Sequence, residues 1–557
     1  MDEGLDFQNP SVMIGEARAI YESYNLDSKR PFGLVLSRTD FGGTHTPVTS
    51  TPFEVLGEIT HEKVFSIFNN GKKELNLYIH IPFCMTKCGY CSYVSRPNPS
   101  PEEVERYLDA LKMEIALYAP QVYNAKKEIV SIYIGGGTPA FLSAAQLGDL
   151  MDFIRQRFDI GRKKIGVCSE SNPLILAGAE GEEKLDILIH YGLDRLNIGV
   201  QSSNHNLLKQ VGRSYYTSED VIKSVELARE KGIKTINLDF MLGLLDQKIE
   251  DVAKDLELIA KLKPESITWY DMRLSEHAWL RQLPDFEERL PLEKEVLTSR
   301  VLIIRTLEKL GYVTKDGHRF YLKNNVDAED AFKKVRSGMH EDMLGLGASA
   351  YSHFFCQSGG KLELLSGMFP FAMLMPTKRQ LETGVFTRNA PNVDAFSRNT
   401  SDINAYMEAL ERGQLPRIKG RIHAPMDIFV SDFIANLKSG DLAFTAREKK
   451  GLMWPSFVNY FVFGNKSDEY YTSVMSEILG YRKKIVRLIK TGYLEFAKNK
   501  DDGKTGWTLR FTEKGRLLSN EICRLLFSPA IDSEMVRQMK LAKPNQTGRA
   551  GRLTLKA

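Results

Sequence analysis

The sequence predicts an α/β protein built around an incomplete parallel barrel. Between residues 75 and 275, short β-rich runs alternate with longer segments of helical periodicity, six times in all. This alternation is typical of parallel strands joined by crossover helices. Six units fit a partial (β/α)6 barrel better than a closed eightfold one, and a doubly wound open sheet is the structural alternative. The expected strands are 75–81, 129–135, 164–170, 194–201, 234–242 and 266–274.

The segments between these strands carry signals for the start of a helix. The clearest is the Ser-Pro-Glu-Glu sequence at 100–103, which offers an N-cap, a proline at the first helical position and acids in the first turn. Further helices are expected to begin near Ser143, Ser218 and Lys248. These helices supply the crossovers that a parallel sheet needs.

The regions on either side of the core lack its regular alternation of strand and helix signals. The core is expected over residues 74–280, after an extension, 1–73, in which regular signals are few. Residues 281–420 are expected to complete the barrel and to form a linker region. Within them, 291–310 has helical periodicity and 343–352 indicates a small-residue strand and turn.

The C-terminal part indicates a compact unit of its own over residues 421–530. A basic amphipathic helix is followed by two strands separated by a polar turn that contains Asp-Gly, and then by another helix, which is the order of a winged helix. Winged helices with basic helices bind nucleic acid in some proteins. The last residues, 531–557, are polar and basic and are expected to form a mobile tail. The four elements are expected at 481–490, 492–496, 507–512 and 513–522.

Composition limits the class of protein. The chain has 557 residues and should form two to four folded units. Hydrophobic residues make up 43% and charged residues 26%, and the net charge is only +4, so we expect neither nucleic acid nor a membrane as a partner. There is no apolar run long enough for a membrane span, and the acidic start lacks a signal sequence. We therefore expect a cytoplasmic protein.

Three of the six cysteines are clustered and carry the functional argument. Cys84, Cys88 and Cys91 lie at spacings of four and three, just after the first expected strand. Three soft ligands in one loop suit a thiophilic metal centre. Zinc needs a fourth ligand, and the nearest candidate, His80, should point away from the loop. Iron–sulfur clusters are normally held by four thiolates, so three would leave one iron open. Three packing cysteines are the structural alternative.

The segment CMTKCGYC has the CxxxCxxC pattern and resembles the motif of the radical S-adenosylmethionine (SAM) enzymes. The preceding YIHIPFC resembles the HemN-like branch of that superfamily. This branch contains coproporphyrinogen III dehydrogenases, heme chaperones, and class C methyltransferases and cyclopropanases. The resemblance is strong over 75–274, weak to residue 352, and returns in the winged-helix-like segment. It implies a 4Fe-4S cluster held by the three cysteines and two SAM molecules.

The resemblance also implies which residues contact SAM. Gly136, Gly137 and Thr138, in the GGGTP sequence after the second strand, would meet the first SAM and the edge of the second. Glycines allow the backbone to approach a ligand closely. A phosphate loop is the alternative, but neither GxGxxG nor GK[ST] is present. Glu170, which ends the third strand, would bind the first SAM, and Tyr78 would lie beside the two SAM molecules.

The second SAM would be held by residues at or after the ends of later strands. The resemblance assigns it Gln201, Arg213 and Asp239, and an arginine suits a carboxylate. Each has a structural alternative, since a lone arginine often forms a surface ion pair. Together they lie near the carboxyl ends of strands, where barrel active sites are built. The remaining assignments are Tyr90, beside the SAM molecules, and Arg273 and Tyr351, through the main chain. No catalytic side chain is assigned.

Within the branch, three functions compete. The favoured hypothesis is transfer of a methyl or methylene group from the second SAM to an unsaturated carbon of a natural product or tetrapyrrole. Coproporphyrinogen dehydrogenases usually have another cysteine two residues after the third, where this chain has Tyr93. Heme chaperones of the branch are usually much shorter. The resemblance further implies a small-molecule or carrier-tethered substrate, a flavodoxin or ferredoxin as reductant, and a lid role for the winged-helix-like unit in place of nucleic-acid binding.

Overall fold

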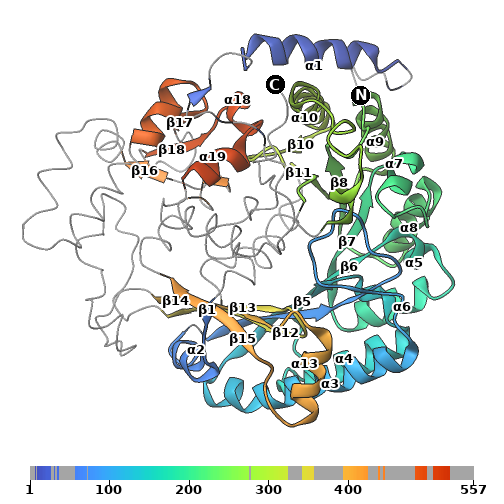
Figure 1. Cartoon of the computed structure of the whole chain (residues 1–557), viewed down its shortest axis with the longest axis vertical. Helices are drawn as coiled ribbons and strands as arrows, with labels where there is room; N and C mark the ends of the chain where they lie inside the picture. The colour runs from blue at the N-terminus through green and yellow to red at the C-terminus, as the bar shows by residue number, and fades with distance from the viewer. Residues whose placement is uncertain are drawn as a thin grey trace, which may run out of the picture.

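The computed structural model describes residues 9–26, 57–71, 73–274, 278–323, 342–356, 393–423, 443–445, 483–498 and 506–526, together with a few single positions. In this part of the chain, 13 strands form one curved sheet in the order β1-β15-β14-β13-β12-β2-β5-β6-β7-β8-β9-β11-β10. Figure 1 shows the crossover helices along the outer side of this sheet.

The centre of the sheet confirms the predicted partial barrel. Six strands lie side by side in the order of the sequence, and adjacent members of this group are parallel to each other. In a doubly wound sheet the order of the strands reverses at a switch point. Here the six strands follow the order of the sequence without a reversal, which excludes that alternative. These strands are β2 (Glu74–Ile81), β5 (Glu128–Gly136), β6 (Gly166–Ser171), β7 (Leu193–Gln201), β8 (Thr235–Leu242) and β9 (Ser266–Asp271).

The crossover helices begin where the sequence places their caps. Ser100 and Ser143 each form a capping box with the residue three positions later, at the starts of α3 (Pro101–Asn124) and α4 (Ala144–Arg157). The cap of α8 (Ser218–Glu230) is Thr217, one residue before the expected start. Lys248 precedes α9 (Ile249–Leu262). The other helices between the strands are α5 (Pro173–Ala177), α6 (Gly181–His190) and α7 (His205–Gln210).

The edges of the sheet extend beyond the sequence prediction. The strand and turn expected at 343–352 are β12 (Asp342–Leu346), which is parallel to β2, and the start of β13 (Tyr351–Cys356). An antiparallel meander then continues outward. It consists of β14 (Val393–Asn399), β15 (Ile418–His423) and β1 (Gly57–Glu58), and the opposite edge has β11 (Arg319–Leu322) and β10 (Tyr312–Val313). Two helices flank these edges, α10 (Glu293–Lys309), as expected over 291–310, and α13 (Ile403–Glu411).

The N-terminal extension is more regular than predicted. It contains α1 (Ser11–Ser23) and α2 (His61–Phe68). Figure 1 shows α1 next to α10, and the ring of Phe68 at the end of α2 lies 4.8 Å from that of Phe354 in β13. The buried apolar residues of α1 recur at helical spacing, and this spacing is the sequence signal that predicts the helix.

The C-terminal unit has the predicted order of elements. Residues 483–490 are helical. They are followed by β17 (Leu494–Lys498), β18 (Gly506–Phe511), α18 (Glu513–Arg516) and α19 (Ser519–Leu525). β18 pairs with both β17 and β16 (Ala443–Thr445). The turn at 501–505 and the tail at 531–557 lie outside the described residues, and the domain boundaries stay predictions.

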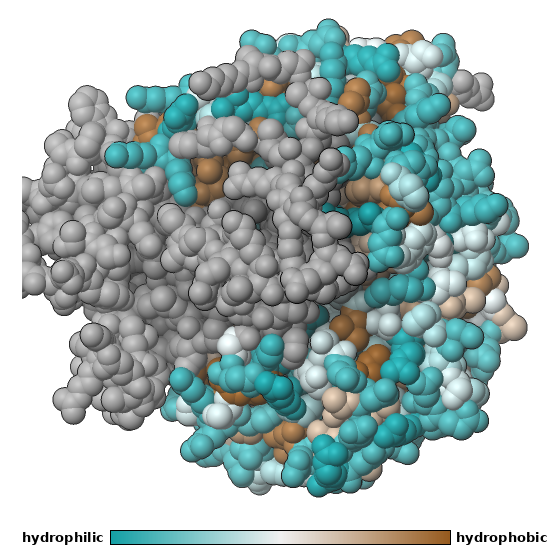
Figure 2. Space-filling view, viewed as in Figure 1, coloured by the Kyte–Doolittle hydropathy of each residue, from teal (hydrophilic) through white to brown (hydrophobic). Residues whose placement is uncertain are grey.

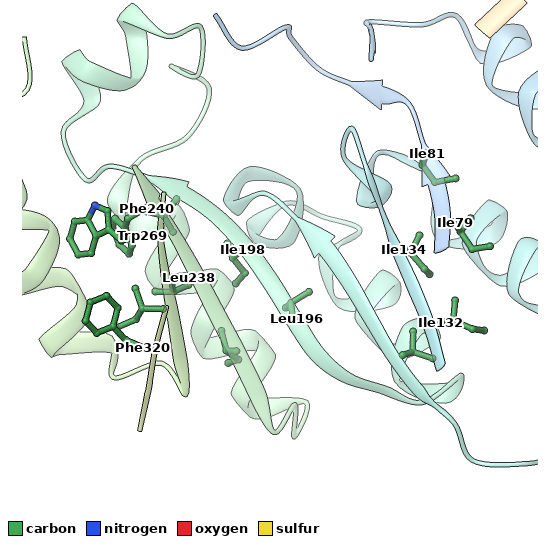
Figure 3. Packing of buried hydrophobic residues seen from close by; sticks show 14 of the residues in the cluster. Ile79, Ile81, Ile132, Ile134, Leu196, Ile198, Leu238, Phe240, Trp269 and Phe320 are labelled. Atoms are coloured by element: carbon green, nitrogen blue, oxygen red, sulfur yellow. The ribbon is translucent and has the colours of Figure 1, made fainter. Parts of the chain in front are cut away.

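The core lies between the parallel strands and their helices. Figure 3 shows side chains of alternate residues, such as Ile79 and Ile81 in β2 or Ile132 and Ile134 in β5, packed in one layer. Because successive side chains of a strand face opposite sides, the residues between them face the concave side. On the face seen in Figure 2, apolar residues form small separate patches. Among the described residues, no helix has the length and apolar character needed to cross a membrane.

Candidate cluster and cofactor site

The three clustered cysteines lie in a loop that leaves the carboxyl end of β2. This loop starts with β3 (Phe83–Cys84), which pairs with β4 (Arg96–Pro97). All three cysteines are half-buried and have free thiols. The amide of Gly89 donates to the carbonyl of Val211 at 3.0 Å, and a Cβ at Gly89 would lie 2.5 Å from Leu280. A larger residue than glycine therefore does not fit there, and the loop is held against the segment after β7.

The donor set fits a multinuclear cluster better than a single ion. Among the described residues, no three His, Cys, Asp or Glu side chains converge on one point. The thiolates of an iron–sulfur cluster bind different irons and need not converge. Burial raises the pKa of the Cys91 thiol to about 11. Without metal, the Cys91 thiol is therefore protonated, and metal binding there must release its proton.

His80 is not available as a fourth ligand. Its Nδ1 lies 2.8 Å from the Tyr78 hydroxyl, and its Nε2 lies 3.3 Å from the carbonyl oxygen of Val94. Burial lowers the pKa of His80 to about 4, so the ring is neutral, with Nε2–H donating and Nδ1 accepting. Both ring nitrogens are thus occupied, although the ring does not point away from the cysteine loop as predicted, because it contacts Val94 within that loop.

The glycine sequence after β5 packs directly against the cysteine loop. Gly136 has a φ of +112°, and a Cβ there would lie 2.8 Å from the His80 ring. A Cβ at Gly137 would lie 2.9 Å from the Sγ atom of Cys84. The amides of Gly137 and Thr138 donate to the carbonyls of Ile81 and Phe83, each at 2.8 Å. These two amides therefore position the loop and are not open to a ligand.

Arg213 joins the end of β7 to the cysteine loop. Its Nη1 lies 3.9 Å from the Sγ of Cys88 and 3.3 Å from the Tyr90 hydroxyl, and its Nη2 donates to the carbonyl of Gly199 at 2.9 Å. Its Nε is buried and has no hydrogen-bond partner among the described residues. A buried donor without a partner is costly. This orphaned donor belongs to a guanidinium that contacts the cysteine loop through Cys88, and it fits a site for an anionic ligand such as a SAM carboxylate.

Gln201 lies at the same end of β7 in an unusual conformation. Its φ is +62°, in the left-handed region, and the pairing of β7 with β8 shifts register between Gly199 and Gln201. A non-glycine residue rarely adopts this conformation unless its surroundings impose it, and such residues cluster at functional sites.

A second group of predicted residues lines the concave side of the strands. The Tyr78 ring lies 5.1 Å from that of Tyr351 and 6.0 Å from that of Tyr133. The hydroxyl of Tyr133 donates to Glu170, and Nδ2 of Asn197 donates to the Tyr133 hydroxyl at 3.3 Å. Tyr133 and Asn197 were missed by the sequence analysis. Their position on the face opposite the apolar residues of β5 and β7 was the available signal.

The last two predicted residues have different surroundings. Asp239, in β8, accepts a hydrogen bond of 2.7 Å from Nδ2 of Asn237. Arg273 follows β9, and its Nη2 lies 2.8 Å from Glu521 in α19 and 3.5 Å from Asp271. The structure thus places Arg273 in an ion-pair network with the C-terminal unit, an arrangement that the sequence did not predict.

Comparison with known proteins gives one consistent picture. Residues 78–259 match the Radical SAM superfamily. The heme chaperone HemW of Buchnera aphidicola subsp. Schizaphis graminum is 32% identical over 286 residues, which are 50% of this chain and 69% of that protein. Escherichia coli HemW is 33% identical over 207 residues, 36% of this chain and about half, 51%, of that protein. The oxygen-independent coproporphyrinogen III oxidase of Helicobacter pylori strain 26695 is 26% identical over 382 residues, 66% of this chain and 72% of the relative.

A solved structure shows the same fold. Coproporphyrinogen III oxidase (HemN) from Escherichia coli, a radical SAM enzyme, superposes with a TM-score of 0.60 over 85% of this chain and 94% of that chain, at 23% identity. These four relatives are named heme chaperones and coproporphyrinogen oxidases, and none of their names is that of a methyltransferase.

Proposed function

The chain belongs to the radical SAM superfamily, in its HemN-like branch, and from this premise we propose that it is a radical SAM enzyme whose substrate or cargo is a tetrapyrrole. In this proposal Cys84, Cys88 and Cys91 hold a 4Fe-4S cluster, and SAM binds at its open iron. The family supports the cluster and SAM, and the names of the relatives support the tetrapyrrole.

The observation that carries the SAM site is Arg213. A half-buried guanidinium beside the cysteine loop, with a buried Nε that has no partner among the described residues, would bind the carboxylate of a SAM molecule. Gln201, Glu170 and Asp239 would accept or donate hydrogen bonds to the remaining polar groups of one or two SAM molecules. When bound, the cluster and SAM would supply reductive cleavage of the sulfur–carbon bond of SAM. The protein's part is to orient these groups and to exclude water.

Among tetrapyrrole functions, heme binding and delivery has the most support. HemW relatives are 32% and 33% identical to this chain, against 26% for the coproporphyrinogen oxidase. Tyr93 also stands where the dehydrogenases usually have a further cysteine. Methyl or methylene transfer, the hypothesis favoured from the sequence, has less support, because these relatives have other names.

One anaerobic experiment separates these functions. The full chain is first reconstituted with iron and sulfide. One sample then receives hemin. A second sample receives coproporphyrinogen III, dithionite and SAM that is deuterated in its methyl group. We expect stoichiometric hemin binding, seen as a new Soret band. Conversion of coproporphyrinogen to a decarboxylated product would favour the oxidase function, and deuterium in 5′-deoxyadenosine would favour methylene transfer. If neither tetrapyrrole binds or reacts, the tetrapyrrole proposal is wrong.

The cluster needs its own control. A Cys84/Cys88/Cys91→Ala triple variant should lose the iron and the visible absorbance of the cluster. Cys523→Ala is the matched control, because Cys523 is a buried cysteine in α19 and far from the loop in sequence. It should keep both. Equal iron contents in the two variants would contradict the assignment of the three ligands.

A further inference from the structure

The end of β7 is held from one side by residues that follow it. The carbonyl of Gly199 accepts from Arg213, and the carbonyl of Val200 accepts from the Tyr216 hydroxyl at 2.6 Å. Gln201 then turns the chain with its φ of +62°. A left-handed residue that is not glycine needs additional contacts to keep it in place. Those contacts come from a different element, α9.

Asp255 of α9 supplies these contacts. It is completely buried, on a helix face that also buries Val252 and Ile259. Its Oδ1 accepts from the amide of Ser203 at 2.5 Å, from the Ser203 hydroxyl at 2.6 Å and from the Ser202 hydroxyl at 3.2 Å. No ion pair of Asp255 is present among the described residues. The side chain of Asp255 therefore accepts its hydrogen bonds from the two residues that follow Gln201.

The path of this loop decides where two site residues lie. A Cβ at Gly199 would be 3.0 Å from Nε2 of Gln201 and 3.2 Å from Nη2 of Arg213. Both side chains therefore lie over Gly199, which has no side chain to displace them. Because Arg213 also contacts Cys88 and Tyr90, the arrangement continues to the cysteine loop. A shift of Ser202 and Ser203 would move Gln201 first and Arg213 with it.

We propose that Asp255 is a positioning residue, which holds Ser202 and Ser203 so that Gln201 and Arg213 take the arrangement that binds SAM. The inference rests on the proposed function, since it takes Gln201 and Arg213 as SAM ligands. Asp255 itself does not touch the ligand. It is a member of a crossover helix, and its type and position carry no signal in the sequence that would single it out.

The test compares three variants of the full chain with its cluster reconstituted. Asp255→Ala removes the acceptor, whereas Asp255→Asn keeps one oxygen that can accept from Ser203. Tyr312→Phe is the control, because it also removes a buried hydrogen bond, which the Tyr312 hydroxyl donates to the carbonyl of Pro264 at 2.6 Å. Pro264 precedes the amino end of β9, whereas the proposed SAM contacts lie at the carboxyl ends of the strands. The measurements are the Kd for SAM, the melting temperature, and hydrogen exchange of the amides in 199–213.

We expect Asp255→Ala to raise the Kd for SAM at least about tenfold, because small displacements of binding groups have large effects. Its amides in 199–213 should exchange faster. Asp255→Asn should stay within about threefold of the wild type, and Tyr312→Phe should lower the melting temperature without changing the Kd or this exchange. If Asp255→Ala does not fold, a Ser202→Ala/Ser203→Ala variant, which removes the hydroxyl donors, gives the same test.

Two negative results have different meanings. If the wild type binds SAM and Asp255→Ala binds it equally well, the positioning role is overturned and the proposed function stands. If the wild type holds its cluster but binds no SAM, the proposed function fails and the inference falls with it.

Discussion

Arginines lie near the carboxyl ends of both β7 and β9, but only one of the two ends supplies carboxylates for them. Beyond β7, Arg213 contacts a carbonyl, a phenol and a thiol, and no acidic side chain among the described residues. After β9, Arg273 pairs with Glu521 and Asp271, and Arg300 of α10 also pairs with Asp271. Both arginines after β9 are nearly completely buried.

The arginine near the end of β7 is therefore able to bind an anionic ligand, whereas the arginines after β9 are already paired with carboxylates of the protein. Buried charges are costly unless they are paired. At β9 the pairing comes from the protein itself and includes α19 of the C-terminal unit, so this network joins that unit to the barrel. At β7 the described residues supply no carboxylate for the Arg213 guanidinium. A buried Nε without a partner in this part of the chain is common to Arg213 and Arg273, so the carboxylates alone distinguish the two ends. The two predicted SAM contacts, Arg213 and Arg273, therefore have different expected roles.

The largest effect on the free energy of unfolding is expected where a buried ion pair at the β9 end is broken. Arg300→Leu leaves Asp271 buried with only the more distant Arg273, at 3.5 Å, as a cation. Removing one partner of a buried ion pair costs about 3–5 kcal/mol. The free energy of unfolding, measured in urea, should fall by that amount. Arg305→Leu is the control on the same helix, because its pair with Glu513 is exposed and should contribute less than about 1 kcal/mol. Equal losses would contradict the comparison.

The next effect concerns ligand binding. Arg213→Leu should weaken SAM binding roughly 10- to 100-fold, since a hydrogen bond to a charged group contributes about 1.5–3 kcal/mol. The free energy of unfolding of the metal-free chain should change by less than about 1 kcal/mol, because no carboxylate is left unpaired. Anaerobic calorimetry measures the first quantity and urea unfolding the second. A large loss of stability with unchanged SAM binding would assign Arg213 to the structure instead.

A smaller effect is expected for the contact between the barrel and α19. Glu521→Gln removes the charge that Arg273 contacts at 2.8 Å but keeps a hydrogen-bond acceptor, so the loss in stability should be about 1–2 kcal/mol. Limited proteolysis should release the C-terminal unit faster. Glu513→Gln, at an exposed pair, serves as the control. Unchanged proteolysis would show that this ion pair does not hold the unit.

The smallest effect is a dependence on pH at the β9 end. His318 lies 3.0 Å from Nδ2 of Asn520 and 3.2 Å from the carbonyl of Trp269, so its neutral form accepts with Nε2 and donates with Nδ1. Burial, and next the charge of Arg300, lower the pKa of His318 well below its usual value. The 4.0 Å approach to Asp271 does not reverse this, since Arg300 is closer to that carboxylate.

The sign of the effect follows from where the proton binds. Below about pH 6.5 the unfolded chain takes up a proton on this histidine and the folded chain does not. Stability should therefore fall by about 1 kcal/mol as the pH decreases from 6.5 to 5.5. His318→Gln should lack this component, which urea unfolding at several pH values would show. A wild type and variant with parallel pH profiles would mean that His318 is protonated in the folded chain.

The sequence predicted the elements that follow local rules. The six strands, the caps at Ser100 and Ser143, and the cysteine loop depend on periodicity and spacing within short segments, and the structure contains all of them. The pairing of Arg273 with Glu521 was not predicted, because it joins residues that are 248 positions apart. Asp255 and Asn197 were also missed. Their importance depends on which loop or strand faces them, and a single sequence does not show this.

The most direct test of the account is the spectrum of the reconstituted protein with and without SAM. The account predicts about four irons per chain, a reduced-cluster electron paramagnetic resonance signal that changes when SAM is added, and a change in Arg213→Leu that requires a roughly 10- to 100-fold higher SAM concentration. A single bound zinc, or a cluster signal that SAM leaves unchanged in the wild type, would contradict the claim that the cysteine loop and the end of β7 form one cofactor site.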